Sequence, residues 1–397
     1  MKNSKLTIVT PYFPTKNNQY GGIFVYDQTK VIAEQVGHVD VYVTRPWFKI
    51  SRQFPFISSC DDDLVLKDPK LDNVSLHLLR YLPFPKDSIF YHLSLSVSVF
   101  FNKREFSKNL LVHTVYPLGV AVQKLKLLPT IVIHGSDFRY FSKNTKQSNV
   151  IVAAINNSPT VCVSEGLMRE VKQEVKATNG ITVNGTNISV IENGVLIPDV
   201  FDPDISDIRG DLPQRNVTNP DVFNFVFVGS LIKLKGVYEL LEAFSELQKI
   251  SKEQTYSLTF VGDGVEKNTL EEKVKINNIK NVSFLGAVEN EKVMLILAEN
   301  DCLILPSYQE GFGRVIIEML SLGKPVISTK SGGPEFILNE QTGLIVPPKD
   351  VDALKSAMGE VCAKYDSYNP TEIKEYVSQN YSLVKQTSKL LNCVFRN

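Results

Sequence analysis

The chain has 397 residues, of which 43% are hydrophobic and 22% are charged, as in an ordinary folded globular protein and not a disordered one. This length exceeds what one hydrophobic core usually holds, so we expect two domains. Lysine plus arginine and aspartate plus glutamate number 43 each, so the bulk charge gives no support to a nucleic-acid-binding function.

Five cysteines are scattered along the chain without a CxxC pair or the spacing of a zinc site or a disulfide framework. This pattern indicates thiols in a reducing environment, and we therefore expect a cytoplasmic protein. The apolar run before Pro11 is too short for the core of a signal peptide. No stretch of about eighteen apolar residues occurs, so we expect no transmembrane helix.

The first half of the chain alternates short β-rich runs with segments of helical spacing. A strand is predicted at 5–10, and the Gly21-Gly22 pair precedes a helical pattern over 23–35. Residues 88–103 alternate polar and apolar positions as a strand does, but their length favours a helix. Further strands are predicted at 38–44, 110–116, 130–135, 160–165 and 188–194.

Residues 198–222 contain five Pro or Gly residues and no periodicity, which predicts a linker. We expect a first domain over 1–200, a second over 201–375, and a C-terminal helix over 376–397 that packs back towards the first domain. Strands of the second domain are predicted at 223–230, 257–264, 281–288, 301–307 and 324–333. The alternation predicts an α/β protein of two Rossmann-like, doubly wound parallel-sheet domains facing a central cleft, with ligands at the carboxyl ends of strands.

The sequence EGFGRVIIEML at 310–320 combines a Gly-Phe-Gly turn with an apolar helical face. Free backbone N–H groups at such a helix start favour an anion, and glycines let the main chain approach a ligand. Glu318 falls in the second turn, where a carboxylate can accept two vicinal hydroxyls. A solvated surface glutamate is the alternative, but it does not explain the glycines.

Two further strand ends carry candidate residues. Lys235 stands beside Gly236 at a helix start, where a cation opposes the helix dipole unless an anion lies between them. His134 in the run HGSD ends a predicted strand, and a histidine at that edge of a sheet is a candidate ligand-binding residue. A solvated lysine and a core histidine are the alternative readings.

Other motifs are set aside. Asp61-Asp62-Asp63 lies in a polar insert outside any strand–turn context, so we expect no metal site there. Gly262-Asp263-Gly264 lacks the third glycine of a dinucleotide-binding fingerprint, and neither a Walker A motif nor an HExxH motif is present.

Together these residues resemble the retaining glycosyltransferases of family four (glycosyl transferases group 1), which have the two-domain GT-B architecture. The motifs follow in order along nearly the whole chain: the glycine pair at 21–22, HGSD at 134–137, ENGV at 192–195, GSLIKLKG at 229–236, the E-x7-E signature in PSYQEGFGRVIIEML, and SGGPEFI at 331–337. The resemblance implies a metal-independent hexosyltransferase, without a cofactor, that takes a nucleoside-diphosphate sugar as donor.

The resemblance also implies residue roles. Glu310 would face the donor sugar near its anomeric carbon, and His134 would reach that sugar from the first domain, which makes these two the catalytic candidates. Glu318 would bind the ribose hydroxyls, and Lys235 the diphosphate. The remaining donor-binding candidates are Gly21, Gly22, Gly229, Ser230, Gly262, Ala287, Val288, Gly311, Phe312, Gly313 and Arg314.

One position departs from the family pattern. Ser230 stands where the family usually has an arginine on the diphosphate, and Lys233 and Arg314 are the candidates to replace it. Losing a charge-assisted donor would cost about 1.5–3 kcal/mol if nothing replaces it.

The acceptor side is less defined. Residues 45–58 mix the sole Trp with three Phe and three cations, and they are either buried loop residues or a peripheral membrane surface for a lipid-linked acceptor. We expect a cytoplasmic enzyme, at the inner face of the membrane if that surface binds lipid, that glycosylates a glycan or lipid-linked acceptor in surface polysaccharide, lipopolysaccharide or glycolipid biosynthesis. The alternatives are a GT-B sugar-nucleotide epimerase and a non-catalytic nucleotide-sugar-binding protein.

Overall fold

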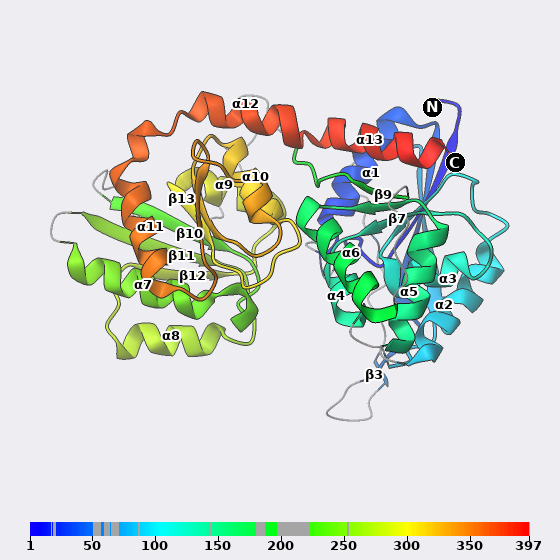
Figure 1. The fold of residues 1–397 in the computed structure, drawn as a ribbon, viewed down its shortest axis with the longest axis horizontal. Coiled ribbons are helices and arrows are strands. Elements are labelled where there is room, and N and C mark those ends of the chain that lie inside the picture. Colours follow the sequence, from blue (N-terminus) through cyan, green and yellow to red (C-terminus); the bar gives the residue numbers. More distant parts are fainter. Residues whose placement is uncertain are drawn as a thin grey trace. The chain divides into compact units, whose positions relative to one another are not determined.

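The computed structural model describes residues 1–16, 18, 21–50, 57–58, 64, 71–85, 88–142, 145–179, 187–196, 222–251 and 254–396 (Figure 1). The chain divides into two compact units. The N-terminal unit comprises Met1–Asn193 and Leu383–Asn397, and the C-terminal unit comprises Gly194–Ser382. The predicted boundary at residue 200 and most of the predicted linker lie outside the described residues.

The N-terminal unit is built on a parallel sheet of seven strands within the described residues, in the order β5-β2-β1-β6-β7-β8-β9. The strands are β1 Lys5–Thr10, β2 His38–Pro46, β5 Val74–Tyr81, β6 Leu110–His113, β7 Thr130–Ile133, β8 Thr160–Cys162 and β9 Ile188–Val190. A two-stranded ribbon is formed by β3 Lys49–Ile50 and β4 Ile57–Ser58. The strand order reverses between β1 and β6, which makes their carboxyl ends the expected place for a ligand.

Helices cover the N-terminal sheet in two groups. Helices α1 and α13 pack together, and the others follow one another along the sheet (Figure 1). The helices are α1 Ile23–Gln35, α2 Ile89–Asn102, α3 Val120–Gln123, α4 Ser136–Ser142, α5 Thr145–Asn157, α6 Glu165–Asn179 and α13 Leu383–Phe395. The helix predicted over 88–103 is confirmed as α2.

The C-terminal unit is built on a second parallel sheet, of six strands, in the order β12-β11-β10-β13-β14-β15. The strands are β10 Val222–Val228, β11 Thr255–Val261, β12 Val282–Gly286, β13 Cys302–Leu305, β14 Val326–Thr329 and β15 Gly343–Val346. The helices are α7 Val237–Ile250, α8 Lys267–Ile276, α9 Asn290–Glu299, α10 Arg314–Ser321, α11 Val351–Ala363 and α12 Pro370–Tyr381. The switch point of this sheet lies between β10 and β13, and Phe225, Val226 and Phe227 of β10 are fully buried as a central parallel strand requires.

Several predicted boundaries need correction. The strand predicted over 110–116 ends at His113, because the chain turns there into a short π-helical segment over Val115–Gly119. The segment predicted as one helix over 376–397 is divided, since α12 ends at Tyr381 and α13 begins at Leu383. The α13 residue Ser388 donates a hydrogen bond from Oγ to Oε1 of Gln35 on α1 at 3.1 Å. Strands β5 and β15 were not predicted.

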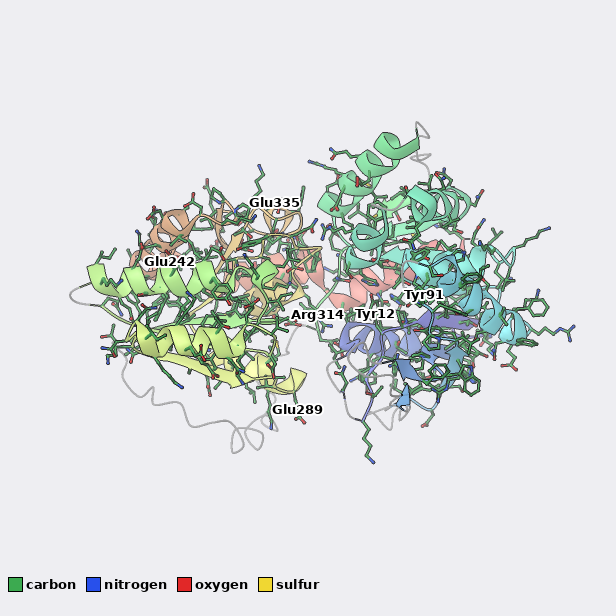
Figure 2. The ribbon with its side chains drawn as sticks, turned by 90° about the horizontal axis from the view of Figure 1, so that it is seen from below. Tyr12, Tyr91, Glu242, Glu289, Arg314 and Glu335 are labelled. Carbon is green, nitrogen blue, oxygen red and sulfur yellow. The ribbon has the colours of Figure 1, made fainter. Side chains whose placement is uncertain are left out.

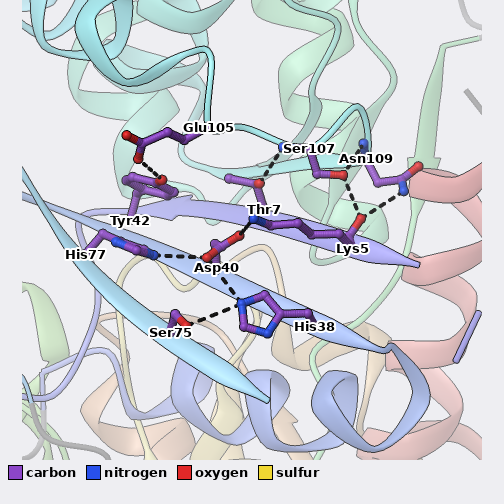
Figure 3. A network of polar contacts seen from close by, with 10 residues as sticks. All are labelled: Lys5, Thr7, His38, Asp40, Tyr42, Ser75, His77, Glu105, Ser107 and Asn109. Carbon is purple, nitrogen blue, oxygen red and sulfur yellow. Dashed lines mark hydrogen bonds and ion pairs between the residues drawn. The ribbon is translucent and has the colours of Figure 1, made fainter. Parts of the chain in front are cut away.

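A polar network lies on one face of the N-terminal sheet, near the amino ends of its strands (Figure 3). Asp40 on β2 is buried, and its carboxylate lies 2.6 Å from Lys5 Nζ on β1 and 3.0 Å from His77 Nε2 on β5. Burial opposes ionisation of Asp40, but the hydrogen bonds from Lys5 and His77 outweigh it and hold its pKa below the usual value. The network therefore ties three neighbouring strands together through one ionised carboxylate.

We expect Asp40→Asn to destabilise the protein by about 1–3 kcal/mol at pH 7, because Lys5 loses its buried partner. The folded-state pKa of Asp40 is lowered, so its contribution is present above pH 4 and is lost as the pH falls through that pKa. The free energy of unfolding, measured by urea denaturation between pH 3 and pH 7, should therefore fall less steeply with decreasing pH for the variant than for the wild type. An equal fall for the two proteins would contradict this role.

Candidate functional site

Three loops pack against one another at the carboxyl ends of β10, β13 and β14, which are neighbours in the C-terminal sheet. The central loop, residues 306–313, is tied to both others by backbone hydrogen bonds. Its Tyr308 amide donates to the Leu234 carbonyl at 2.9 Å, and its Glu310 amide donates to the Ser331 carbonyl at 2.9 Å. The sequence motifs 229–236, 306–320 and 331–337 thus form one structural cluster.

Gly236 sets how closely two of these loops approach. Its φ is +67°, and a Cβ atom at this position would lie 2.0 Å from the Pro306 carbonyl oxygen. Only glycine fits such a contact without moving the main chain. The close approach carries the preceding residue, Lys235, to the loop that contains Glu310.

Lys235 and Glu310 form an ion pair with an Nζ–Oε2 distance of 2.6 Å. Their side chains are 24% and 16% exposed, so the pair is partly shielded from water. Ser307 Oγ donates to the same Oε2 atom at 3.3 Å, and the Gly311 amide donates to Oε1 at 3.2 Å. The carboxylate is therefore held in place by a cation, a hydroxyl and a backbone amide.

Glu318 also has a cationic partner. It is buried on α10, and Arg314 Nε lies 2.9 Å from its Oε1 atom, one helical turn away. Figure 2 labels Arg314 at the edge of the C-terminal unit. Each glutamate of the predicted E-x7-E signature is thus ion-paired to a cation that the sequence analysis names.

The other donor-binding candidates of this unit follow the adjacent strands. The Gly229 amide donates to the Val261 carbonyl at 2.9 Å, and the Gly262 amide donates to the Gly286 carbonyl at 2.7 Å, so the ends of β10, β11 and β12 lie side by side. Ala287 follows β12 and is exposed, Val288 is half-buried, and Ser230 is exposed. Gly311 and Gly313 flank Phe312, which is buried against Tyr381 with ring centroids 5.9 Å apart.

In the N-terminal unit, His134 follows β7 and lies in a group of aromatic rings. Its ring centroid is 4.8 Å from that of Phe24 and 5.8 Å from that of Tyr12. It stacks on His113 at the end of β6, whose Nδ1 lies 3.1 Å from His134 Nε2. Burial lowers the pKa of His134 to about 4 and the pKa of His113 well below its usual value, so both rings are uncharged at neutral pH.

Asp137 of the HGSD motif holds the loop around His134. Its Oδ1 accepts from the His134 amide at 3.0 Å and from the Gly135 amide at 2.9 Å, and its Oδ2 accepts from the Val115 amide at 2.9 Å. Burial raises the pKa of Asp137 to about 6, and these backbone donors oppose that rise. Asp137 therefore connects the loops after β6 and β7.

The predicted glycine pair is near the same aromatic group. Gly22 precedes α1 with φ +78°, and a Cβ atom there would lie 2.3 Å from the backbone of Tyr12 and Phe13. The Gly21 amide donates to Asn18 Oδ1 at 3.0 Å. The structure thus brings Gly22 to the chain segment whose Tyr12 ring contacts His134.

Beside these residues the N-terminal unit contains a cavity of about 300 Å³ at the carboxyl ends of its strands. Four tyrosines line it, together with Asp137 and the hydroxyls of Thr44, Thr114 and Ser136; the tyrosines are Tyr12, Tyr81, Tyr91 and Tyr116. Tyr12 and Tyr91 are labelled in Figure 2. Burial raises the pKa of Tyr12 to about 12, so it keeps its proton and can donate a hydrogen bond.

This tyrosine cavity was not predicted from the sequence. The four tyrosines come from different segments, and no spacing joins them. The only available signal was that Tyr12 follows one predicted strand, 5–10, and Tyr116 is the last residue of another, 110–116. Of the aromatic segment 45–58, residues 51–56 lie outside the described part, as does the triplet Asp61–Asp63; Trp47 is exposed.

The family described as Glycosyl transferases group 1 matches residues 209–377. The C-terminal unit belongs to the glycosyl transferases group 1. The chain is 29% identical over 252 residues to TuaC of Bacillus subtilis, a glycosyltransferase assigned to teichuronic acid biosynthesis, covering 62% of this chain and 59% of TuaC. It is 24% identical to the uncharacterized glycosyltransferase MJ1178 of Methanocaldococcus jannaschii, covering 78% of this chain and 85% of MJ1178.

Solved structures with a similar fold match almost the whole chain. Sucrose-phosphate synthase from Thermosynechococcus elongatus superposes with a TM-score of 0.72 at 20% identity, covering 99% of this chain and 100% of that one. HepE of Anabaena in complex with UDP-glucose gives a TM-score of 0.68 at 17% identity with the same coverage. These structures show the GT-B fold over the whole chain, as the sequence predicted, and the group 1 match lies within the C-terminal unit.

Within the described residues, no helix is long and apolar enough to cross a membrane.

We expect acid to destabilise the N-terminal unit through His134. Its folded-state pKa is lowered to about 4, so between about pH 6.5 and pH 4 the unfolded chain binds the extra proton and stability falls as the pH falls. At pH 5 this loss amounts to about 2 kcal/mol relative to pH 8.

His134→Asn should reduce the difference in unfolding free energy between pH 8 and pH 5, measured by urea denaturation followed by tyrosine fluorescence. An unchanged difference would show that His134 is not held uncharged by burial.

Proposed function

We propose that this protein is a retaining, metal-independent glycosyltransferase that moves a sugar from a nucleoside-diphosphate sugar to a glycan or lipid-linked acceptor. The processes proposed are surface polysaccharide, lipopolysaccharide or glycolipid synthesis at the inner face of the membrane. The observation that carries the proposal is the Lys235–Glu310 ion pair, held at the switch point of a group 1 glycosyltransferase domain.

In this proposal the diphosphate binds at Lys235 and at the backbone amides of the loop 306–313. Lys235 is 24% exposed, so a ligand can reach it. A donor diphosphate would share Lys235 with Glu310 and leave that carboxylate facing the sugar. The cation and the amides would then stabilise the charge that develops on the departing diphosphate.

Glu318 takes the ribose hydroxyls in the same proposal. Its carboxylate has four lone-pair positions, and Arg314 Nε lies 2.9 Å from its Oε1 atom. Arg314 compensates the charge of this buried carboxylate. HepE, which has a similar fold, forms a complex with UDP-glucose, and this supports a nucleotide sugar as the donor.

His134 is assigned to the donor sugar as an uncharged hydrogen-bonding group. Its Nε2 is already hydrogen-bonded to His113, so a sugar hydroxyl would meet Nδ1 unless it displaces His113. A neutral imidazole can donate or accept there without adding a second positive charge to the site.

The tyrosine cavity is assigned to the acceptor. Aromatic rings pack against the apolar faces of sugar rings, while tyrosine, threonine and serine hydroxyls bind sugar hydroxyls. The cavity lies beside His134 on the same sheet edge, since Tyr12 both lines it and contacts the His134 ring.

The test is a donor screen with UDP-, GDP- and ADP-sugars, read first as a thermal shift and then as release of the nucleoside diphosphate. A donor that binds should stabilise the wild type, and transfer or slow hydrolysis should follow. Lys235→Met should lower turnover about 10- to 100-fold, the effect of losing one charge-assisted donor, while Lys249→Met, on the exposed end of α7, should not.

The same assay decides which cation replaces the family arginine at Ser230. Arg314→Ala with unchanged affinity and turnover would remove Arg314 as a candidate, and Lys233→Ala applies the same criterion to Lys233. Isomerisation at C2 of the sugar would identify an epimerase instead, and binding without turnover a non-catalytic protein.

A further inference from the structure

Helix α2 presents an apolar face to solvent. Its sequence, Ile89–Asn102, contains no charged residue. Phe90, Val97 and Phe101 are 54%, 58% and 78% exposed, and with Leu93 they occupy positions i, i+3, i+7 and i+11 of one helical stripe. The opposite stripe, which includes Leu95 and Val99, is buried in the core.

This face continues onto neighbouring segments. Leu78 within β5, Leu82 and Phe84 after it, and Trp47 after β2 are also exposed. Together with α2 they form a groove of about 640 Å³. Single exposed apolar residues are ordinary, but a contiguous aromatic surface of this kind marks an interaction site.

The charges around the groove are positive. Arg80 lies in the groove with its guanidinium 5.7 Å from the Trp47 ring, and Lys103 Nζ lies 4.5 Å from the Phe100 ring. Arg104 follows and is exposed. No acidic residue lines the described groove, and the nearby Glu105 accepts a hydrogen bond from Tyr42 Oη at 2.9 Å.

We infer that this surface, made by the outer stripe of α2 with Trp47, Leu82 and Phe84, docks on an anionic lipid bilayer. Aromatic and aliphatic side chains enter the boundary between headgroups and acyl chains, and Arg80, Lys103 and Arg104 meet lipid phosphates. The charged groups of Arg80 and Lys103 lie over the Trp47 and Phe100 rings, so cations and aromatic side chains share one surface. The sequence analysis left residues 45–58 open between buried loop residues and such a surface, and Trp47 of that segment lines the groove together with α2.

Docking there would place the tyrosine cavity close to the membrane. Tyr81 lines both the groove and the cavity, and its ring centroid lies 5.9 Å from that of Tyr91 in the cavity wall. The acceptor is then a membrane-resident amphiphile, whose polar end enters the cavity while its hydrocarbon part stays in the bilayer. This last step rests on the proposed function; bilayer binding itself does not.

The test is flotation of the full chain with phosphatidylcholine vesicles, with and without phosphatidylglycerol, at low and high salt. The wild type should float with the anionic vesicles, less at high salt. The triple variant Phe90→Ser, Val97→Ser and Phe101→Ser should bind at least about tenfold less, and Lys103→Ala with Arg104→Ala should remove the preference for anionic lipid. A matched control replaces three exposed apolar residues of the C-terminal unit, Ile250, Val265 and Ile276, with serine, and should float like the wild type.

Circular dichroism and thermal melting confirm that the variants fold, and hydrolysis of a soluble donor should be the same for the triple variant and the wild type. Absence of wild-type flotation at low salt, or wild-type binding by the triple variant, overturns the inference. A wild-type dimer that the triple variant converts to a monomer, without flotation, also overturns it and assigns the face to self-association. Flotation without any donor turnover would leave the bilayer surface standing and contradict the proposed function instead.

Discussion

The close contact between Gly236 and the Pro306 carbonyl oxygen sets the geometry of the C-terminal site. It joins the loop after β10 to the loop after β13, on the two strands that flank the switch point of the sheet. Any side chain at residue 236 would force these loops apart. Lys235 would then leave Glu310, and a carboxylate that is 16% exposed would lose its cation. The geometry of the site thus depends on the absence of a side chain at residue 236.

The two candidate carboxylates share one electrostatic arrangement. Glu310 and Glu318 are each shielded from water, and each has a cation within 2.9 Å, Lys235 in one case and Arg314 in the other. Pairing compensates for the cost of burying each charge. The N-terminal site works differently, because its two histidines are held uncharged by burial, and burial raises the pKa of Tyr12 and of Tyr91, which keep their protons. Cations for binding an anion are therefore found in the C-terminal unit, whereas uncharged hydroxyl groups and the carboxyl group of Asp137 line the N-terminal cavity.

The sequence predicted what depends on local pattern and on motifs. The helix over 23–35, the two parallel sheets and the positions of Gly236 and Glu318 follow from periodicity, strand ends and the family resemblance. Arg314 and Glu318 are four residues apart on one helix, so their ion pair could have been predicted from the spacing. The sequence analysis considered Arg314 only as a ligand of the diphosphate.

What the sequence did not predict depends on contacts between distant segments. Tyr12, Tyr91 and Tyr116 meet only because β1, α2 and the segment after β6 come together at one sheet edge. The stacking of His134 on His113 has the same origin. The helical periodicity of α2 indicated which of its residues share a face. It did not indicate that the face with Phe90, Val97 and Phe101 would be exposed. Strand ends were overestimated because an apolar run continues into the turn after the last ladder hydrogen bond, as at His113.

The most direct test is isothermal titration calorimetry with two nucleotides of the base that the donor screen identifies. The nucleoside diphosphate and the nucleoside monophosphate are each titrated into the wild type and into the variant Lys235→Met. If Lys235 holds the diphosphate, the variant should lose about 10- to 100-fold in affinity for the diphosphate, as expected for one charge-assisted hydrogen bond, and bind the monophosphate as the wild type does. An equal loss for both nucleotides, or no loss for either, would contradict the assignment of the Lys235–Glu310 pair to the donor diphosphate.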